Sequence, residues 1–326
     1  MPRLPGSESE VKLIRFRHWI FPLLMTSLLI SSCAGSPAQI AYPQALRVTA
    51  TTSIVADIVR QVGGDYVQIS TLVPIGTDEH QYQPTPQDVV NVSKAVIVFE
   101  NGLGLEQFMD KLIQNAGGNA KVVSVSDGIT PRQFSGDIKL PDEPTASSGG
   151  DPHVWVDPAN VKTWVKNIEK TLGEADPGHA GEYAKNAQST IDSLTALDEW
   201  IQAQVAPLPQ SSRKIVTDHL IFGYFCDRYG FDQVGAIIPS YSSAAESSAQ
   251  DLAAIEDAIR NLHINAIFLG KNVSSTLTQR VAEDTGVKII QIYTGSLTTS
   301  DGPAPTYQDY MRYNVTAIVN GLSGGK

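Results

Sequence analysis

Three histidines of this chain, His80, His153 and His219, each lie where an apolar run of the sequence breaks. In α/β proteins, ligand-binding groups are placed at the breaks that follow strands. Three neutral imidazoles that converge in space form a metal site, and three nitrogen ligands favour a borderline ion such as zinc. The spacing alone does not establish convergence, because no two of these histidines are close in sequence. A single loop histidine is most often an exposed or hydrogen-bonded side chain.

The sequence around each histidine carries further information. The segments are Pro-Ile-Gly-Thr-Asp-Glu-His-Gln-Tyr-Gln-Pro-Thr-Pro (74–86), Asp-Pro-His-Val-Trp-Val-Asp-Pro (151–158) and Phe-Gly-Tyr-Phe (222–225), which follows a strand-like run ending in His219. They resemble the signatures of the metal-binding lipoproteins that supply zinc, manganese or iron to ABC importers, the cluster A-I (TroA/ZnuA-like) family. The resemblance covers about residues 46–322.

This resemblance implies an extracytoplasmic solute-binding protein with two lobes joined by one long rigid helix. The metal would lie between the lobes, with His80 and His153 from the first lobe and His219 from the second. It would be transported cargo, delivered to the membrane permease of an ABC importer. We expect a monomer.

The chain departs from the family pattern at the fourth ligand. Most members take it from an aspartate just after the last strand, where this chain has Gly295. Either a water completes the site or another carboxylate does, and Glu79, adjacent to His80, is the first candidate. We expect water or a mobile Glu79, because a solvated side chain is the simpler expectation for a loop glutamate. An aspartate introduced at 295 would then add a ligand and tighten binding. Weaker candidates are Asp78, Asp301 and Glu246.

The ligand set also predicts the metal. A histidine at position 219 favours zinc, because manganese-type members tend to have a glutamate there, which is a harder donor. The missing aspartate removes a further hard donor. We therefore predict Zn²⁺ as the cargo, with Mn²⁺ less favoured. A manganese- or iron-binding member of the same family is the alternative.

Two other functional classes are compatible with parts of the sequence. Three histidines with an open position also occur in catalytic zinc sites, so a zinc-dependent hydrolase is a second alternative. The sequence has no nucleophile elbow and no His-Glu-x-x-His motif, and only Glu79 lies directly beside a proposed ligand as a general base. We therefore expect no enzyme. A cell-adhesion role, sometimes described for lipoproteins of this family, has no direct support in the sequence.

The first residues predict export. Basic side chains precede an apolar run from Trp19 to Ile30 that is too short to span a bilayer. Leu-Ile-Ser-Ser-Cys-Ala-Gly at 29–35 resembles a lipobox, which would make Cys33 the acylated mature N-terminus. Residues 1–32 would then be a lipoprotein signal peptide and 33–45 a flexible tether. The protein would be held to the membrane by its lipid, facing the periplasm or the cell exterior.

Cysteine usage and charge constrain the class further. With Cys33 acylated, Cys226 has no disulfide partner, so we expect it to be a buried apolar side chain on a helix. The formal net charge of −10 argues against nucleic acid and anionic membrane surfaces as partners.

Short β-branched runs alternate with amphipathic segments and predict an α/β fold whose sheets are mostly parallel. The predicted strands are 46–51, 67–73, 95–99, 121–125, 213–217, 266–269 and 288–293. The predicted helices include 53–62, 219–229, 248–261, 274–285 and 305–320.

Two Asp-Pro pairs predict helix starts, at Asp157-Pro158 and at Asp176-Pro177. The second opens the longest helix, which Pro207 and Pro209 end. Together with the resemblance, these signals predict a first lobe at 46–173, a linking helix at 174–209 and a second lobe at 210–326. The Pro-, Ser- and Gly-rich segment 130–152 is predicted to be a mobile loop.

Overall fold

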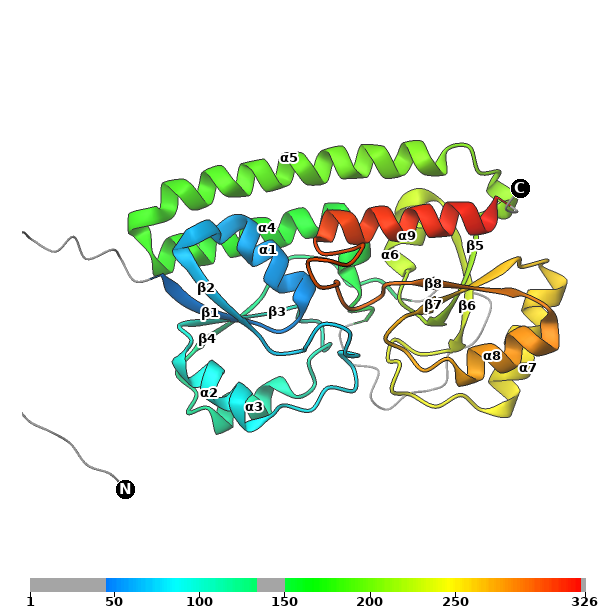
Figure 1. Ribbon diagram of the computed structural model, residues 1–326, viewed down its shortest axis with the longest axis horizontal. Helices are drawn as coiled ribbons and strands as arrows, with labels where there is room; N and C mark the ends of the chain where they lie inside the picture. The colour runs from blue at the N-terminus through cyan, green and yellow to red at the C-terminus, as the bar shows by residue number, and fades with distance from the viewer. Residues whose placement is uncertain (1–44, 134–149, 324–326) are drawn as a thin grey trace, which may run out of the picture. The chain divides into compact units, whose positions relative to one another are not determined.

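The computed structural model describes residues 45–133 and 150–323 (Figure 1). Its first parallel sheet comprises β1 (Leu46–Ala50), β2 (Val67–Thr71), β3 (Ile97–Glu100) and β4 (Lys121–Ser124). Their spatial order is β2-β1-β3-β4. The chain crosses from one side of β1 to the other, so the carboxyl edge between β1 and β3 is a switch point where ligands bind in such sheets.

The second sheet repeats this arrangement. It comprises β5 (Lys214–His219), β6 (Asp232–Ile238), β7 (Ala266–Gly270) and β8 (Lys288–Ile292), in the order β6-β5-β7-β8, all parallel. The predicted α/β architecture with two parallel sheets is confirmed. Strand β6 was not predicted, because a strand buried on both faces has no apolar–polar alternation to reveal it.

The helices of the first lobe start at clear local signals. They are α1 (Ser53–Gly63), α2 (Pro86–Lys94), α3 (Met109–Asn115) and α4 (Pro158–Ala175). The Thr52 hydroxyl caps α1 by accepting from the backbone N–H of Val55, and Gly64 ends the helix with a φ of 55°. Asp157 caps α4 as predicted, accepting from the N–H of Ala159 at 2.8 Å.

The second lobe contains α6 (Gly223–Tyr229), α7 (Ala249–Asn261), α8 (Thr276–Thr285) and α9 (Tyr307–Leu322). The prediction of a helix from residue 219 was wrong in its start, because α6 begins at Gly223. His219 is the last residue of β5, so a parallel strand rather than a helix directs its side chain.

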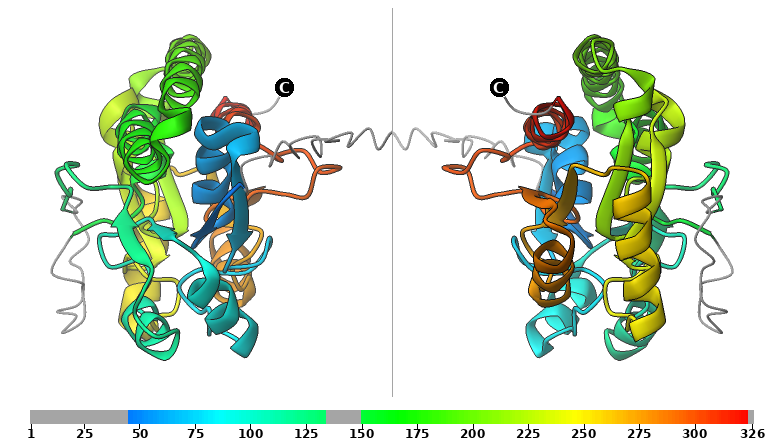
Figure 2. Two further views of the ribbon diagram at one scale, coloured as in Figure 1. Left: turned by 90° about the vertical axis from the view of Figure 1, so that its left-hand side faces the viewer. Right: turned by 90° about the vertical axis from the view of Figure 1, so that its right-hand side faces the viewer.

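The long helix α5 (Ala180–Val205) joins the two halves. Its 26 residues give it a length of about 39 Å. Asp176-Pro177 opens a preceding 3-10 turn, Pro177–His179, and not the α-helix itself. Figures 1 and 2 show α5 beside α4, with α1 and α9 nearby, and it packs on all three.

An ion pair fixes α5 to the second lobe. Arg228 of α6 donates to Asp198 of α5 from Nε at 2.8 Å, and the Tyr229 hydroxyl donates to the same carboxylate at 2.8 Å. The Arg228 guanidinium also lies 3.1 Å from Asp157, the cap of α4. Three helices therefore meet at one guanidinium.

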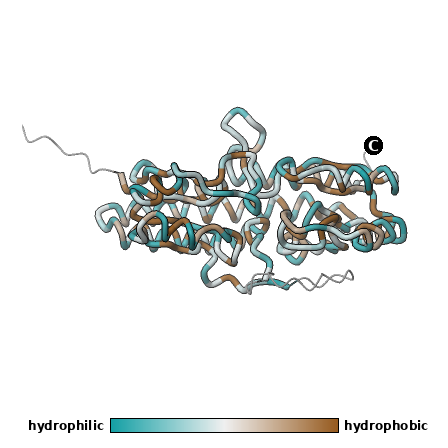
Figure 3. Tube along the Cα trace, turned by 90° about the horizontal axis from the view of Figure 1, so that it is seen from below, coloured by the Kyte–Doolittle hydropathy of each residue, from teal (hydrophilic) through white to brown (hydrophobic). Residues whose placement is uncertain are grey.

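Hydrophilic and hydrophobic residues alternate at short intervals along the chain (Figure 3). The largest core cluster contains residues of both sheets together with the inner face of α5, including Leu194, Leu197 and Ile201. Cys226 is a free, buried thiol in α6, as predicted. Among the described residues, no helix is both long and apolar enough to cross a membrane.

Some predictions lie outside the described residues. These are the signal peptide, the lipidated Cys33, the tether up to residue 44 and the part of the predicted mobile loop at 134–149.

Candidate metal site

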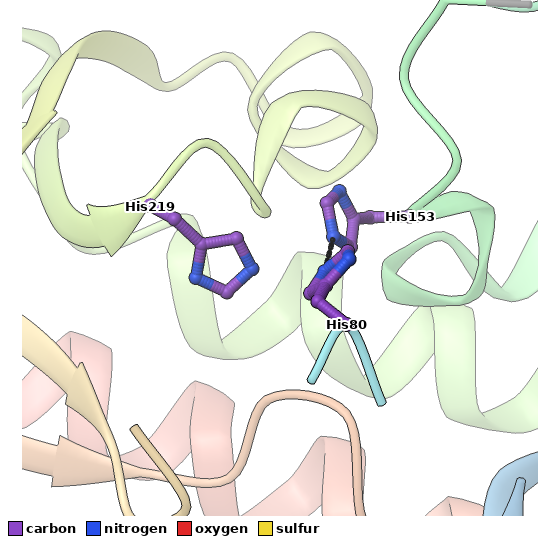
Figure 4. A group of neighbouring side chains, drawn as sticks. All are labelled: His80, His153 and His219. Carbon is purple, nitrogen blue, oxygen red and sulfur yellow. Dashed lines mark hydrogen bonds between the residues drawn. The ribbon is translucent and has the colours of Figure 1, made fainter. Parts of the chain in front are cut away.

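The three predicted histidines converge (Figure 4). His80 lies in the loop between β2 and α2, His153 directly precedes the 3-10 turn Val154–Val156, and His219 ends β5. One nitrogen from each ring lies within 4.8 Å of the other two, and Nε2 of His80 is 3.1 Å from Nε2 of His153. Three ring nitrogens this close can coordinate one ion.

The environment keeps two of the three imidazoles neutral. His153 and His219 are almost fully buried, and His80 is partly exposed. Burial, together with the neighbouring imidazoles, lowers the pKa of both His80 and His153 well below the usual value. Burial also acts to lower the pKa of His219, but the charge of Asp218 outweighs it and raises that pKa. Neutral imidazoles have the lone pair that a metal requires.

An aspartate orients each of the two buried imidazoles. Asp151 Oδ1 accepts from the backbone N–H of His153 at 3.0 Å and lies 2.8 Å from Nδ1 of its ring. Asp218 Oδ1 makes the same two contacts with His219, at 2.7 and 2.5 Å. A carboxylate on Nδ1 fixes the ring and leaves Nε2 as the ligand atom. The buried Nε2 of His219 has no hydrogen-bond partner.

The third aspartate, Asp78, contacts the backbone of His80 and not its ring. Asp78 Oδ1 accepts from the N–H of His80 at 3.0 Å, and its Oδ2 accepts from the Ser243 hydroxyl at 2.6 Å. These three aspartates were not predicted to be orienting groups. The signal was present, because an aspartate stands one or two residues before each histidine.

Arg132 balances the charge of buried Asp151. Its guanidinium lies 3.5 Å from Asp151 Oδ2 and donates from Nε to Asp227 of α6 at 2.9 Å. Burial raises the pKa of Asp151 to about 7, and Arg132 opposes that shift. The guanidinium therefore favours the ionised carboxylate that holds His153.

The environment of Glu79 differs from the one expected from the sequence. Only 4% of it is exposed, so the prediction of a solvated loop carboxylate was wrong. Burial, reinforced by Asp78, raises its pKa to about 7. Its carboxylate lies against Gly295: a Cβ atom on that glycine would be 1.8 Å from both carboxylate oxygens. Glu79 is not part of the 4.8 Å group of ligand atoms.

The other carboxylates that were predicted as possible oxygen donors are either exposed or already hydrogen-bonded to other side chains. Asp78 is buried and bonded to Ser243 and Gln81. Asp301 is exposed and accepts from Thr299, and Glu246 is also exposed. None of these carboxylates belongs to the group of converging ligand atoms.

A cavity of about 720 Å³ opens beside the site. Glu79 and His80 lie at its wall, and the rest comes from α2, α3 and the segments that lead into these helices, including Phe108 and Lys111. The cavity therefore reaches the partly exposed His80.

The chain matches known proteins along most of its length. The family model described as "Zinc-uptake complex component A periplasmic" matches residues 48–321. The manganese-binding lipoprotein MntA of Halalkalibacterium halodurans is 33% identical, over 93% of this chain and 97% of that protein. The iron-binding protein YfeA of Yersinia pestis is 30% identical, over 93% of this chain and 95% of that protein.

The fold also matches that of solved structures. The periplasmic zinc-binding protein TroA of Treponema pallidum superposes with a TM-score of 0.77 at 26% identity, covering 86% of this chain and 99% of that chain. The similarity therefore extends over both sheets and the helix between them.

Proposed function

Because the chain belongs to the zinc-uptake component A family of ABC-importer substrate-binding proteins, we propose that it captures one Zn²⁺ ion with His80, His153 and His219. The observation that carries this proposal is the convergence of three ring nitrogens from segments far apart in sequence. The two halves of the site correspond to the proposed lobes, 46–173 and 210–326, with 174–209 connecting them. The ion is cargo and passes to the permease of an ABC importer.

Donor chemistry supports zinc as the cargo. Three imidazole nitrogens suit a borderline ion better than Mn²⁺, which prefers oxygen donors. The names of the relatives indicate manganese and iron, and that of the structural neighbour indicates zinc. Manganese or iron is therefore the alternative cargo, and the nitrogen-rich set favours zinc over both.

Metal competition tests this preference. We expect the purified protein to bind one Zn²⁺ per chain, and an excess of Mn²⁺ over Zn²⁺ to displace little of it, because His219 supplies nitrogen where a harder donor would favour manganese. Equilibrium dialysis with metal analysis by mass spectrometry measures the occupancy. Bound manganese at equal concentrations of the two free ions would contradict the assignment of zinc.

We also propose that the protein is a monomer held at the outer face of a membrane by lipid on Cys33. The lipobox-like sequence supports the anchor, and the relatives include lipoproteins.

Replacing Cys33 with serine tests the anchor. Without the thiol there is no acylation site, so Cys33→Ser protein should be found in the soluble fraction or should keep its leader. Fractionation and mass measurement of the N-terminus distinguish these products from the wild type. The matched control is Cys226→Ser, which should fractionate like the wild type. Wild-type protein that is soluble and begins at another residue would contradict lipidation.

A further inference from the structure

Arg132 contacts both halves of the molecule with one guanidinium, and its side chain is only 10% exposed. Nη1 lies 3.5 Å from Asp151 Oδ2 and donates to Gln233 Oε1 of β6 at 3.5 Å. Nε and Nη2 donate to the two carboxylate oxygens of Asp227 in α6, at 2.9 and 3.3 Å. The planar fork of the arginine is thus attached to the second half on one side and to Asp151 on the other.

Hydrogen bonds of the backbone hold the same segments together. The N–H of Asp151 donates to the carbonyl of Arg132 at 2.9 Å. The Tyr224 hydroxyl of α6 accepts from the N–H of Arg132 at 3.1 Å and donates to the carbonyl of Asp151 at 2.8 Å. The backbones of Arg132 and Asp151 are therefore bonded to each other and to the start of α6.

Gly223, the first residue of α6, lets the guanidinium approach the helix backbone closely. A Cβ atom on Gly223 would lie 2.0 Å from Nη1 of Arg132 and 2.7 Å from Oδ2 of Asp151. The φ of Gly223 is not positive, so the space and not the backbone conformation requires glycine. The ion pair between Arg132 and Asp151 therefore packs directly on the backbone of the second half.

Asp151 connects this contact to the metal site. Its Oδ1 accepts from the N–H of His153 and lies 2.8 Å from Nδ1 of that ring, while its Oδ2 faces Arg132. A carboxylate is planar, so the position of Oδ2 also determines the position of Oδ1. Asp151 is fully buried, and a buried carboxylate that loses its cation is strongly unfavourable. Without the guanidinium, we expect the carboxylate to reorient and the His153 ring to lose its fixed orientation.

We propose that Arg132 is a positioning residue of the metal site: its guanidinium holds Asp151, and through it the His153 ring, in the orientation that binds the ion. Arg132 acts through Asp151 and is not itself a ligand. The inference rests on the proposed function, because it concerns the same ion. It makes the metal affinity of a histidine in the first half depend on α6 and β6 of the second half.

Substitutions at the guanidinium and at its anchor in α6 test this role. Arg132→Ala removes the fork, and Arg132→Lys keeps the charge at a single point. Asp227→Asn weakens the anchor at a side chain that is 62% exposed. Arg280→Ala is the matched control, because that arginine is exposed and pairs with Asp284 of its own helix.

Three measurements are made on each variant. Zinc dissociation constants are measured by competition with a chromophoric chelator. The visible absorption of bound Co²⁺ reports the coordination geometry, and thermal unfolding without metal reports folding.

We expect Arg132→Ala to weaken zinc binding by about tenfold or more, the usual effect of losing an outer partner of a metal ligand, and to change the Co²⁺ absorption bands. Arg132→Lys should recover only part of the affinity, because one ammonium group does not replace a fork with two sides. Asp227→Asn should weaken zinc binding by about two- to fivefold, because the guanidinium loses one charged partner. This variant still tests the role if Arg132→Ala does not fold. Arg280→Ala should match the wild type.

Wild-type zinc affinity in Arg132→Ala or in Asp227→Asn would overturn the positioning role. Full recovery by Arg132→Lys would also overturn it, because a charge alone would then suffice, and so would a loss of affinity with an unchanged Co²⁺ spectrum. Failure of the proposed function gives a different pattern, because His153→Ala would then also bind zinc like the wild type. If His153→Ala loses zinc and Arg132→Ala does not, the function stands and only the positioning role fails.

Discussion

Replacing any one of His80, His153 and His219 with alanine is expected to weaken zinc binding by well over an order of magnitude. Each imidazole is one of three converging nitrogen donors, and a two-histidine site lacks a ligand that zinc requires. Titration of the three single variants with a competing chelator measures the loss. His153→Ala should show it clearly, because this ring is fully buried and held by Asp151.

The other two histidines of the described residues provide matched controls. His179 stacks on Tyr66 at 4.1 Å and contacts Asp176, and His263 is exposed just after α7. His179→Ala and His263→Ala should therefore bind zinc like the wild type. Normal zinc binding by His153→Ala would refute the site, and loss of binding in either control would show that a different cluster holds the metal.

Asp218→Asn is expected to weaken zinc binding about 10- to 100-fold, the usual effect of removing a carboxylate that orients a metal-binding histidine. Asp218 Oδ1 holds the His219 ring through Nδ1, and its Oδ2 accepts from the N–H of Gly270 at 2.5 Å. Asparagine keeps the shape but loses the charge and one acceptor. The ring would then be less firmly oriented towards the ion.

Asp301→Asn is the control for this substitution, because that carboxylate is exposed and contacts only its own loop. Zinc affinity should fall in Asp218→Asn and stay unchanged in Asp301→Asn. Thermal unfolding without metal separates the effect on binding from an effect on folding. If both variants bind zinc like the wild type, Asp218 does not orient His219.

Local signals accounted for most of the secondary structure. Thr52 and Asp157 cap their helices, and glycine ends α1 at residue 64, because these residues satisfy helix termini within a few positions of the chain. The errors arose where the local signal was weak. The doubly buried β6 has no alternation, and β5 continues to His219 because its ladder with β6 extends that far.

The sequence by itself determined which residues could bind a metal, because each histidine can be recognised from its residue type and from the segment that flanks it. Only the tertiary structure decided that they meet, since both sheets must form before His80, His153 and His219 come within 4.8 Å of each other. It also decided the environment of Glu79. Whether a loop glutamate is solvated or buried depends on what packs against it, and here that is Gly295, from the other half of the chain.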